Sequence, residues 1–157
     1  LAGSGIGAFA TKDAGTNKAV TASGYTLTGA DAANYSIVQP TGLTATIARA
    51  DLALSGVTAT NKTYDGTTVA TLGGVATISA IGGDAVSVTG SGIGAFADKN
   101  AGTGKAVAVN GYTLSGTDAG NYTLVLPANL TADIARASLV VSGVSATSKT
   151  YDGTTSA

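Results

Sequence analysis

The chain has 157 residues, a formal net charge of −1 and only 11% charged residues. It contains no His, Cys or Glu, so most side chains that perform acid–base, nucleophilic and transition-metal chemistry are missing, and we expect neither enzymatic activity nor catalytic residues. Its eight dispersed basic residues cannot form the basic face that nucleic-acid binding requires, and no apolar run reaches the roughly 18–20 residues of a membrane-spanning helix.

The residue types that remain favour strands. The apolar residues, 44% of the chain, are mostly Ala, Val, Leu and Ile. Thr, Val, Ile and Tyr favour β-strands, whereas Gly, present 23 times, interrupts them. The helix formers Glu, Met and Gln are almost absent, since Gln39 is the only residue of these three types. The composition therefore predicts an all-β protein with thin cores of small side chains.

One segment of the sequence occurs twice, at an offset of 87 residues. Residues 3–9 (GSGIGAF) return at 90–96, residues 24–27 (GYTL) at 111–114, and residues 62–68 (KTYDGTT) at 149–155. Aligning residues 1–70 with residues 88–157 without gaps gives 47 identities in 70 positions. This agreement indicates recent duplication of one unit within a longer array.

The offset divides the chain into three parts. Residues 1–49 are the C-terminal part of a preceding unit, residues 50–136 are one complete unit, and residues 137–157 open the following unit. Because the chain begins at Leu1 and contains no Met, we expect it to be an internal piece of a longer protein. The period is too long for one solenoid coil of about 20–30 residues and suits a small domain. We therefore expect small domains in a tandem, elongated array.

Within the complete unit, alternating apolar residues predict a series of short strands. In chain order they lie at residues 52–57, 70–72, 76–80, 86–88, 93–97, 107–109, 112–114, 122–126 and 130–134. Turn residues separate them at Gly73-Gly74 and at residues 82–84, 99–102 and 118–121, and Asn110-Gly111 is a strong hairpin signal.

This pattern favours small antiparallel β-sandwich-like domains, because their turns recur about every 8–12 residues. A β-grasp-like sheet is the alternative. In the strand at 93–97, Ile93, Ala95 and Ala97 share one face and Phe96 lies on the other. Successive units are joined through residues 134–139 (IARASL) without a Gly or Pro linker. A short joint without Gly restricts bending, so we expect a fairly stiff rod.

Several motifs of the unit together carry a family resemblance. They are residues 52–57 (LALSGV), 61–68 (NKTYDGTT), 96–102 (FADKNAG), 111–116 (GYTLSG) and 118–122 (DAGNY). In combination they resemble the YDG repeat of large bacterial exoproteins of the filamentous-haemagglutinin type, and the resemblance covers the whole chain. It implies an adhesin that is exported to the bacterial cell surface or the extracellular space, and it implies no catalytic residues.

The motif that names this repeat is interpreted as a turn. Tyr64-Asp65-Gly66 and its copy Tyr151-Asp152-Gly153 place an Asp that can accept backbone N–H groups before a Gly that tolerates positive φ. Residues 3–8 and 90–95 match the letters of the dinucleotide fingerprint. However, no helix pattern follows them, so we expect no cofactor there.

Weak candidates for a calcium site lie in two turns. Asp98 and Asn100, followed by Gly102, have a spacing similar to that of calcium loops, and Asp118 with Asn121 recurs in both copies. No Glu is present to supply a bidentate contact, and in the other copy Thr11 replaces Asp98. We therefore favour ordinary turns at both places and expect no cofactor.

Three functions remain open at this level. The first is a stiff, non-catalytic spacer within a long surface adhesin, whose partners are the neighbouring repeats of its own chain. The second is a self-assembling subunit of an extracellular filament or biofilm matrix, whose partners are identical chains. The third is a repeat that binds glycan or a host protein. The core-like positions of the tyrosines argue weakly against this third function.

Overall fold

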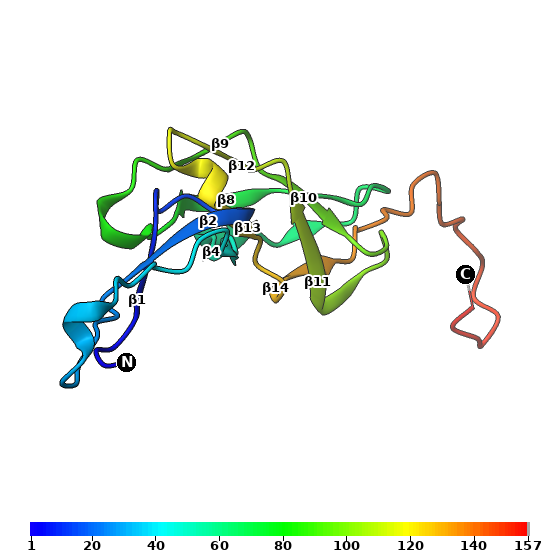
Figure 1. The fold of residues 1–157 in the computed structure, drawn as a ribbon. Helices are drawn as coiled ribbons and strands as arrows, with labels where there is room; N and C mark the ends of the chain where they lie inside the picture. Colours follow the sequence, from blue (N-terminus) through cyan, green and yellow to red (C-terminus); the bar gives the residue numbers. More distant parts are fainter. Residues whose placement is uncertain (157) are drawn as a thin grey trace.

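A computed structural model describes residues 1–156 and shows an all-β chain (Figure 1). In the described part of the chain the strands form several small, mostly antiparallel sheets, and the helical segments are single 3-10 turns of three residues each. These turns are η1 (Ala32–Asn34), η2 (Ile81–Gly83) and η3 (Ala119–Asn121). The prediction of an all-β fold is therefore confirmed.

The largest sheet has five strands and belongs entirely to the complete unit. Its order is β6 (Lys62–Thr63), β14 (Leu130–Ala135), β11 (Gly102–Asn110), β10 (Ile93–Phe96) and β7 (Val69–Ala70). The turn predicted at 99–102 joins β10 and β11 as an antiparallel hairpin. All neighbours in this sheet are antiparallel except β6, which runs parallel to β14.

Three two-stranded sheets complete the unit. β5 (Ser55–Ala59) pairs with β8 (Leu72–Thr77) and β9 (Ser87–Thr89) pairs with β12 (Thr113–Ser115), both antiparallel. In contrast, β4 (Ala50–Ala53) pairs in parallel with β13 (Tyr122–Val125). These parallel pairs were not predicted, because alternation along a strand does not reveal the direction of its partner.

Two predicted turns are wrong. Asn110-Gly111 does not close a hairpin, because β12 pairs with β9 and the chain crosses here from one sheet to another. Gly73-Gly74 lies inside β8, where a bulge shifts the register opposite Gly56. A Cβ on Gly74, whose φ is +79°, would lie 2.0 Å from the carbonyl oxygen of Gly56, so Gly allows a close approach of two strands.

The N-terminal part repeats the strand pairings of the complete unit. β1 (Ile6–Phe9), β2 (Gly15–Ser23) and β3 (Thr44–Ile47) form a three-stranded sheet. The pair of Ile6 with Ser23 corresponds to that of Ile93 with Asn110, and every register that β1–β3 form recurs 87 residues later. The same sequence thus gives the same local pairing in both places, and we call residues 1–49 the half-unit.

A β-bulge is part of this repeated plan. The register shifts between Gly15 and Lys18 in the half-unit, and between Gly102 and Lys105 in the complete unit. Inside the bulge, Asn17 has φ +53° and its counterpart Gly104 has φ +58°. Asn and Gly are the residues that adopt this left-handed conformation most readily, so both copies satisfy the same backbone requirement.

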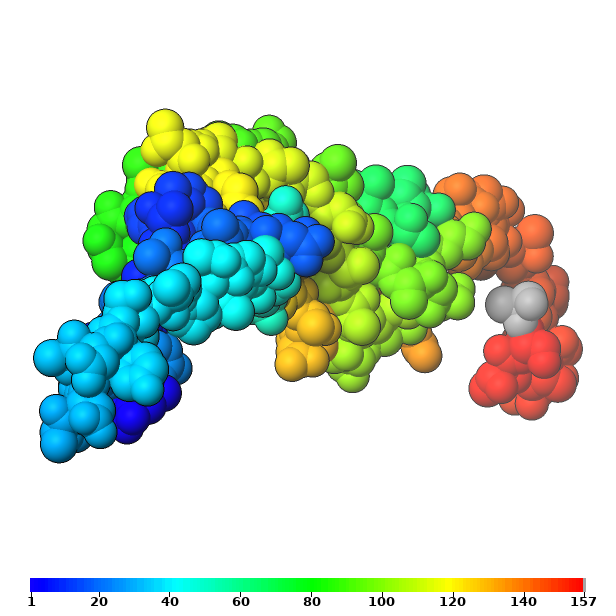
Figure 2. All heavy atoms as spheres, in the orientation of Figure 1, coloured from blue at the N-terminus to red at the C-terminus, as the bar shows by residue number. Residues whose placement is uncertain are grey.

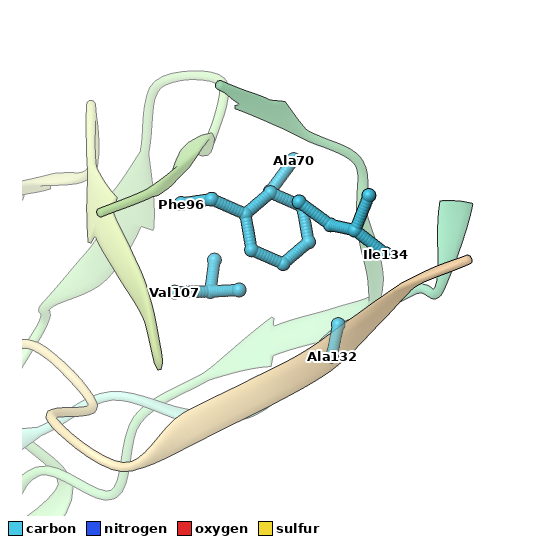
Figure 3. Packing of buried hydrophobic residues seen from close by; sticks show 5 residues of the cluster. All are labelled: Ala70, Phe96, Val107, Ala132 and Ile134. Carbon is cyan, nitrogen blue, oxygen red and sulfur yellow. The ribbon is translucent and has the colours of Figure 1, made fainter. Parts of the chain in front are cut away.

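The main core lies against one face of the five-stranded sheet (Figure 3). The ring of Phe96 packs among Ala70, Val107, Ala132 and Ile134, and only 3% of Phe96 is exposed. Burying such a side chain contributes roughly 2–3 kcal/mol. Phe96 and Gly94 therefore lie on the face of β10 that is turned toward the core. Ile93, on the opposite face, is exposed.

The three parts of the chain follow one another along the molecule. Only residues 48–49 separate β3 from β4, so the half-unit leads directly into the complete unit. Residues 137–156, which we call the tail, contain no strand and extend away from the body at the end opposite the half-unit (Figure 2). No helix within the described residues is long and apolar enough to cross a membrane.

Candidate functional site

A cleft lies between the half-unit and the complete unit. Its volume is about 430 Å³, and we call it the joint cleft. The half-unit contributes Lys12, Ala14, Ile47 and Ala48, and the complete unit contributes Ala50, Ile81, Gly82, Asp84, Asn121 and Tyr122. The cleft is therefore the place where two successive units touch.

Opposite charges meet across the joint cleft. The ammonium group of Lys12 bonds to the carboxylate of Asp84 and lies 3.5 Å from Oδ1 of Asp118. The hydrogen bond from Lys12 lowers the pKa of Asp84, and the same bond raises the pKa of Lys12. Because the Lys12 side chain is largely exposed, each of these pairs contributes little stability alone but favours one orientation of the two units.

Tyr122 anchors the cleft from the complete unit. Its hydroxyl donates to Oδ2 of Asp84 at 2.9 Å and accepts the backbone N–H of Ile81 at 3.0 Å. Burial raises the pKa of this hydroxyl, and the neighbouring Asp84 raises it further. Tyr122 thereby holds the Asp84 carboxylate where Lys12 can reach it.

One hydrogen bond between the units involves the backbone. The N–H of Ala14 donates to Oδ1 of Asn121 at 2.8 Å. Asn121 is the last residue of η3. At the start of the same turn, Oδ2 of Asp118 accepts the N–H of Ala85 at 2.9 Å. The 118–121 turn thus connects β9, β12 and the preceding unit.

The second candidate feature is the YDG turn, residues 62–67. Oδ1 of Asp65 accepts the N–H and the hydroxyl of Thr67, each at 2.9 Å, and binds Nζ of Lys62 at 2.8 Å. Nζ of Lys62 also donates to the carbonyl oxygens of Thr67 and Val69. These hydrogen bonds, first of all that from Lys62, lower the pKa of Asp65 to about 2.

The YDG turn also contacts the core. Nζ of Lys62 lies 5.7 Å from the centroid of the Phe96 ring, which is within the range of a cation–π interaction. Lys62 begins β6, so the turn leads from the parallel edge of the main sheet towards β7 at its other edge. The turn therefore closes the open side of the sheet around Phe96.

The tail forms the same turn without any sheet beside it. Nζ of Lys149 lies 3.0 Å from Oδ1 of Asp152, which also accepts the N–H and hydroxyl of Thr154 at 2.9 Å. The Thr154 N–H and then Lys149 lower the pKa of Asp152. Tyr151 is almost fully exposed here, whereas Tyr64 is only partly exposed. The turn is therefore encoded by residues 149–154 themselves.

The glycine run at 90–95 serves strand packing. It leads into β10 and is not at the start of a helix. A Cβ on Gly92 would lie 2.4 Å from the hydroxyl oxygen of Tyr112 and 2.6–2.7 Å from its ring atoms, and Gly5 has the same relation to Tyr25. The absence of a side chain at Gly92 thus lets the ring of Tyr112 pack directly against the backbone.

The residues considered for calcium have other partners. Oδ1 of Asp98 accepts the N–H of Asn100 at 2.8 Å and binds Nζ of Lys105 at 2.6 Å, and these bonds lower its pKa. Asn121 lines the joint cleft and accepts the N–H of Ala14, and Asp118 accepts the N–H of Ala85, so each of these residues already has a hydrogen-bond partner. Among residues 1–156 no group of three or more acidic residues is arranged to hold a metal ion. The expectation of ordinary turns at both places stays a prediction.

Sequence reasoning did not identify Lys12, Asp84 and Tyr122 as one cluster. Lys12 recurs as Lys99 and Tyr122 as Tyr35, so both show up as repeated residues. Asp84 occurs once, because its counterpart would precede Leu1, and comparison of the two copies cannot detect it. The sequence offered one indication of this cluster: Lys12 recurs as Lys99, which begins the turn predicted at residues 99–102.

The chain is all-β, and the strand pairings of its half-unit recur 87 residues later in the complete unit. The two copies also contact each other directly. A family model for the YDG domain matches residues 1–42 and 48–132, which is most of the chain. The chain therefore belongs to the YDG domain family, as its motifs predict. Searches of curated proteins and of solved structures found no match.

Proposed function

We propose that this chain is a non-catalytic structural segment whose YDG units stand end to end as a stiff spacer in a long bacterial adhesin outside the cell. The observation that carries the proposal is the joint cleft, where the half-unit and the complete unit are connected by two residues and by direct side-chain contacts. The resemblance to repeats of large bacterial exoproteins supports the extracellular placement.

The joint limits bending in two ways. Residues 48–49 connect β3 to β4 without Gly, so few backbone conformations are open to the connection. Lys12 and Ala14 then contact Asp84 and Asn121 about 35 residues or more beyond the connection. Two contacts resist rotation about the connection more than one does, because a rotation that preserves one of the two bond lengths changes the other.

The complete unit does not present Tyr122 on its surface. Tyr122, which a glycan-binding repeat could have presented, is buried and already bonded to Asp84 and Ile81. A filament-forming function has more support, because strand edges and apolar side chains are exposed at both ends of the molecule.

Distance measurements between spin labels test the spacer. The chain has no native Cys, so cysteines can be placed at Thr41 and Ala128, which are exposed and occupy the same position in the two units. We expect a narrow distance distribution for the unchanged joint. It should broaden when Lys12→Ala and Asn121→Ala are combined.

Lys99→Ala is the matched control, because Lys99 is the counterpart of Lys12 and does not line the joint cleft. It should leave the distribution narrow. A broad distribution in the unchanged chain would overturn the spacer proposal, as would equal broadening by the control.

A further inference from the structure

We propose that the outer face of the five-stranded sheet binds the same face of a second copy of this chain, so that chains associate side by side. We call the apolar part of this face the outer patch, and it consists of Val69, Ile93, Ala95, Ala106 and Ala108. The inference depends on residues within one complete unit and not on the stiffness of the joint.

The five-stranded sheet has one covered face. Phe96 and its cluster lie on this inner face, where Ala59 of β5 and Leu72 of β8 also pack against them. Successive residues of a strand point to opposite faces, so the residues that alternate with the buried ones point outward. They are Val69 of β7, Ile93 and Ala95 of β10, and Ala106 and Ala108 of β11.

The strand registers bring these outward residues together. Ala95 lies opposite Val69 on one side and opposite Ala108 on the other, so the three form one row across β7, β10 and β11. Ile93 and Ala106 adjoin this row, two residues along their own strands. Val69 is 66% exposed and Ile93 is 63% exposed. The outer patch is thus one apolar surface on three adjacent strands.

The outer patch departs from the usual composition of a solvent-facing sheet. Antiparallel sheets with one solvated face normally place apolar residues inward and polar residues outward. The β9–β12 sheet follows this rule, because the exposed Thr89 and Thr113 bond to each other through their hydroxyls at 3.0 Å. On the outer face of the main sheet, Asp133 of β14 is charged, but its carboxylate accepts the N–H of Gly104. The apolar residues beside it therefore indicate a surface that another surface covers.

Neighbouring units leave the outer patch exposed. Ile93 has the half-unit before it in the chain, whereas its counterpart Ile6 has the complete unit after it, and each is 63% exposed. Ala8, the counterpart of Ala95, is exposed as well. Neither a preceding nor a following unit covers this position, so the patch recurs on the surface of an array.

This recurrence selects a second copy as the partner. One patch of five residues is small beside the roughly 20–30 residues that each side of a stable interface contributes, so a single contact is weak. Two copies share the same spacing and rotation between successive patches, so several contacts can form at once and bind more tightly together than singly. Facing copies of an uncharged patch leave no charge unpaired, and the small Ala side chains let two sheets approach closely.

Sedimentation equilibrium of the 157-residue chain from micromolar to millimolar concentration tests the inference. We expect the average mass to rise with concentration. A variant with lysines at Ile6, Val69 and Ile93 should associate at least tenfold more weakly, because contact would bury like charges. All three side chains are exposed, so this variant should keep the melting temperature of the unchanged chain.

Val75→Lys is the matched control. Val75 is 75% exposed in β8, and the β5–β8 sheet lies on the covered side of the main sheet. The control should therefore leave the dependence of mass on concentration unchanged.

A mixture of oppositely charged variants identifies the partner. Aspartates at Ile6, Val69 and Ile93 give a second variant that should also stay monomeric alone. Mixed with the lysine variant at low salt, it should form one-to-one dimers, because each patch then meets the opposite charge. A mixture that stays monomeric would overturn the proposal, and so would association that survives the lysines or is lost equally in Val75→Lys. An unchanged chain that is monomeric at millimolar concentration would overturn it too and assign the outer patch to a different partner.

Discussion

At the scale of single residues, Asp65 shows how a short motif specifies a conformation. Its carboxylate accepts two hydrogen bonds from Thr67 and one from Lys62, and the next residue, Gly66, has φ +81°. Each of these interactions lies within the YDG turn, which explains why the tail repeats them around Asp152. The three letters of the motif thus describe a turn that needs no neighbouring strand.

The lowered pKa of Asp65 leads to a pH dependence of stability. Its folded pKa of about 2 lies below the unfolded value of about 3.9. The stability it contributes is therefore fully present above about pH 4 and is lost as the pH falls through about 2. We expect Asp65→Asn to lower the melting temperature at pH 5, and to reduce the further decrease between pH 4 and pH 2.

Asp152→Asn is the matched control for this experiment. Asp152 makes the same turn in the tail, where no strand of the folded body depends on it. Its substitution should leave the melting temperature unchanged at both pH values. Equal pH profiles for Asp65→Asn and the unchanged chain would show that the carboxylate of Asp65 does not stabilise the fold.

Residue chemistry predicted some sites better than others. The YDG turn could be predicted because Asp and Gly act on the backbone within a few residues. The pairing of Lys12 with Asp84 could not, because the two are 72 positions apart and the contact exists only once the units are side by side. The same reason hid the bond from Ala14 to Asn121.

At the scale of strands, the two copies provide an internal comparison of packing. Phe96 in β10 is enclosed by β7, β11 and β14, whereas Phe9 in β1 lacks an equivalent of β7. We expect Phe96→Ala to reduce the free energy of unfolding by about 3–5 kcal/mol, as for other buried aromatic residues. Phe9→Ala should cost about 1 kcal/mol or less because its site is open.

Urea denaturation of both variants measures this difference. The two substitutions remove the same atoms from the same sequence context, so the difference reports the missing strands and not residue type. Equal losses would mean that Phe9 is packed in solution as tightly as Phe96.

The strands themselves were predicted well where alternation was regular. The predictions at 52–57, 93–97, 107–109, 122–126 and 130–134 each overlap an observed strand. The turns predicted at Gly73-Gly74 and Asn110-Gly111 are wrong. Residues that favour turns also occur in β-bulges and where the chain passes from one sheet to another, so residue type alone does not distinguish these structures. The partners of β4 and β6 depend on contacts about 70 residues away, which no local pattern contains.

At the scale of the whole molecule, the half-unit and the complete unit should differ in local stability. Residues 1–49 hold only the three strands β1, β2 and β3, whereas β11 lies within a five-stranded sheet, so we expect the half-unit to open more easily than the complete unit. Hydrogen exchange at low concentration tests this directly. We expect amides of β11 to be protected far longer than those of β2, although the two strands pair in the same register. High protection throughout residues 1–49 of a monomer would contradict it.

The parallel pairing of β6 with β14 has a consequence for a protein under mechanical load. A unit in a stretched array is pulled at Ala50, where it begins, and at Ala135, where β14 ends. β6 follows the first point along the chain and β14 ends at the second. The two strands pair at Ile134 and Ala135, and the N–H of Tyr64 donates to the carbonyl oxygen of Ala135. In the array proposed above, tension along the chain shears these hydrogen bonds together instead of breaking them one by one, which raises the force needed to open a unit.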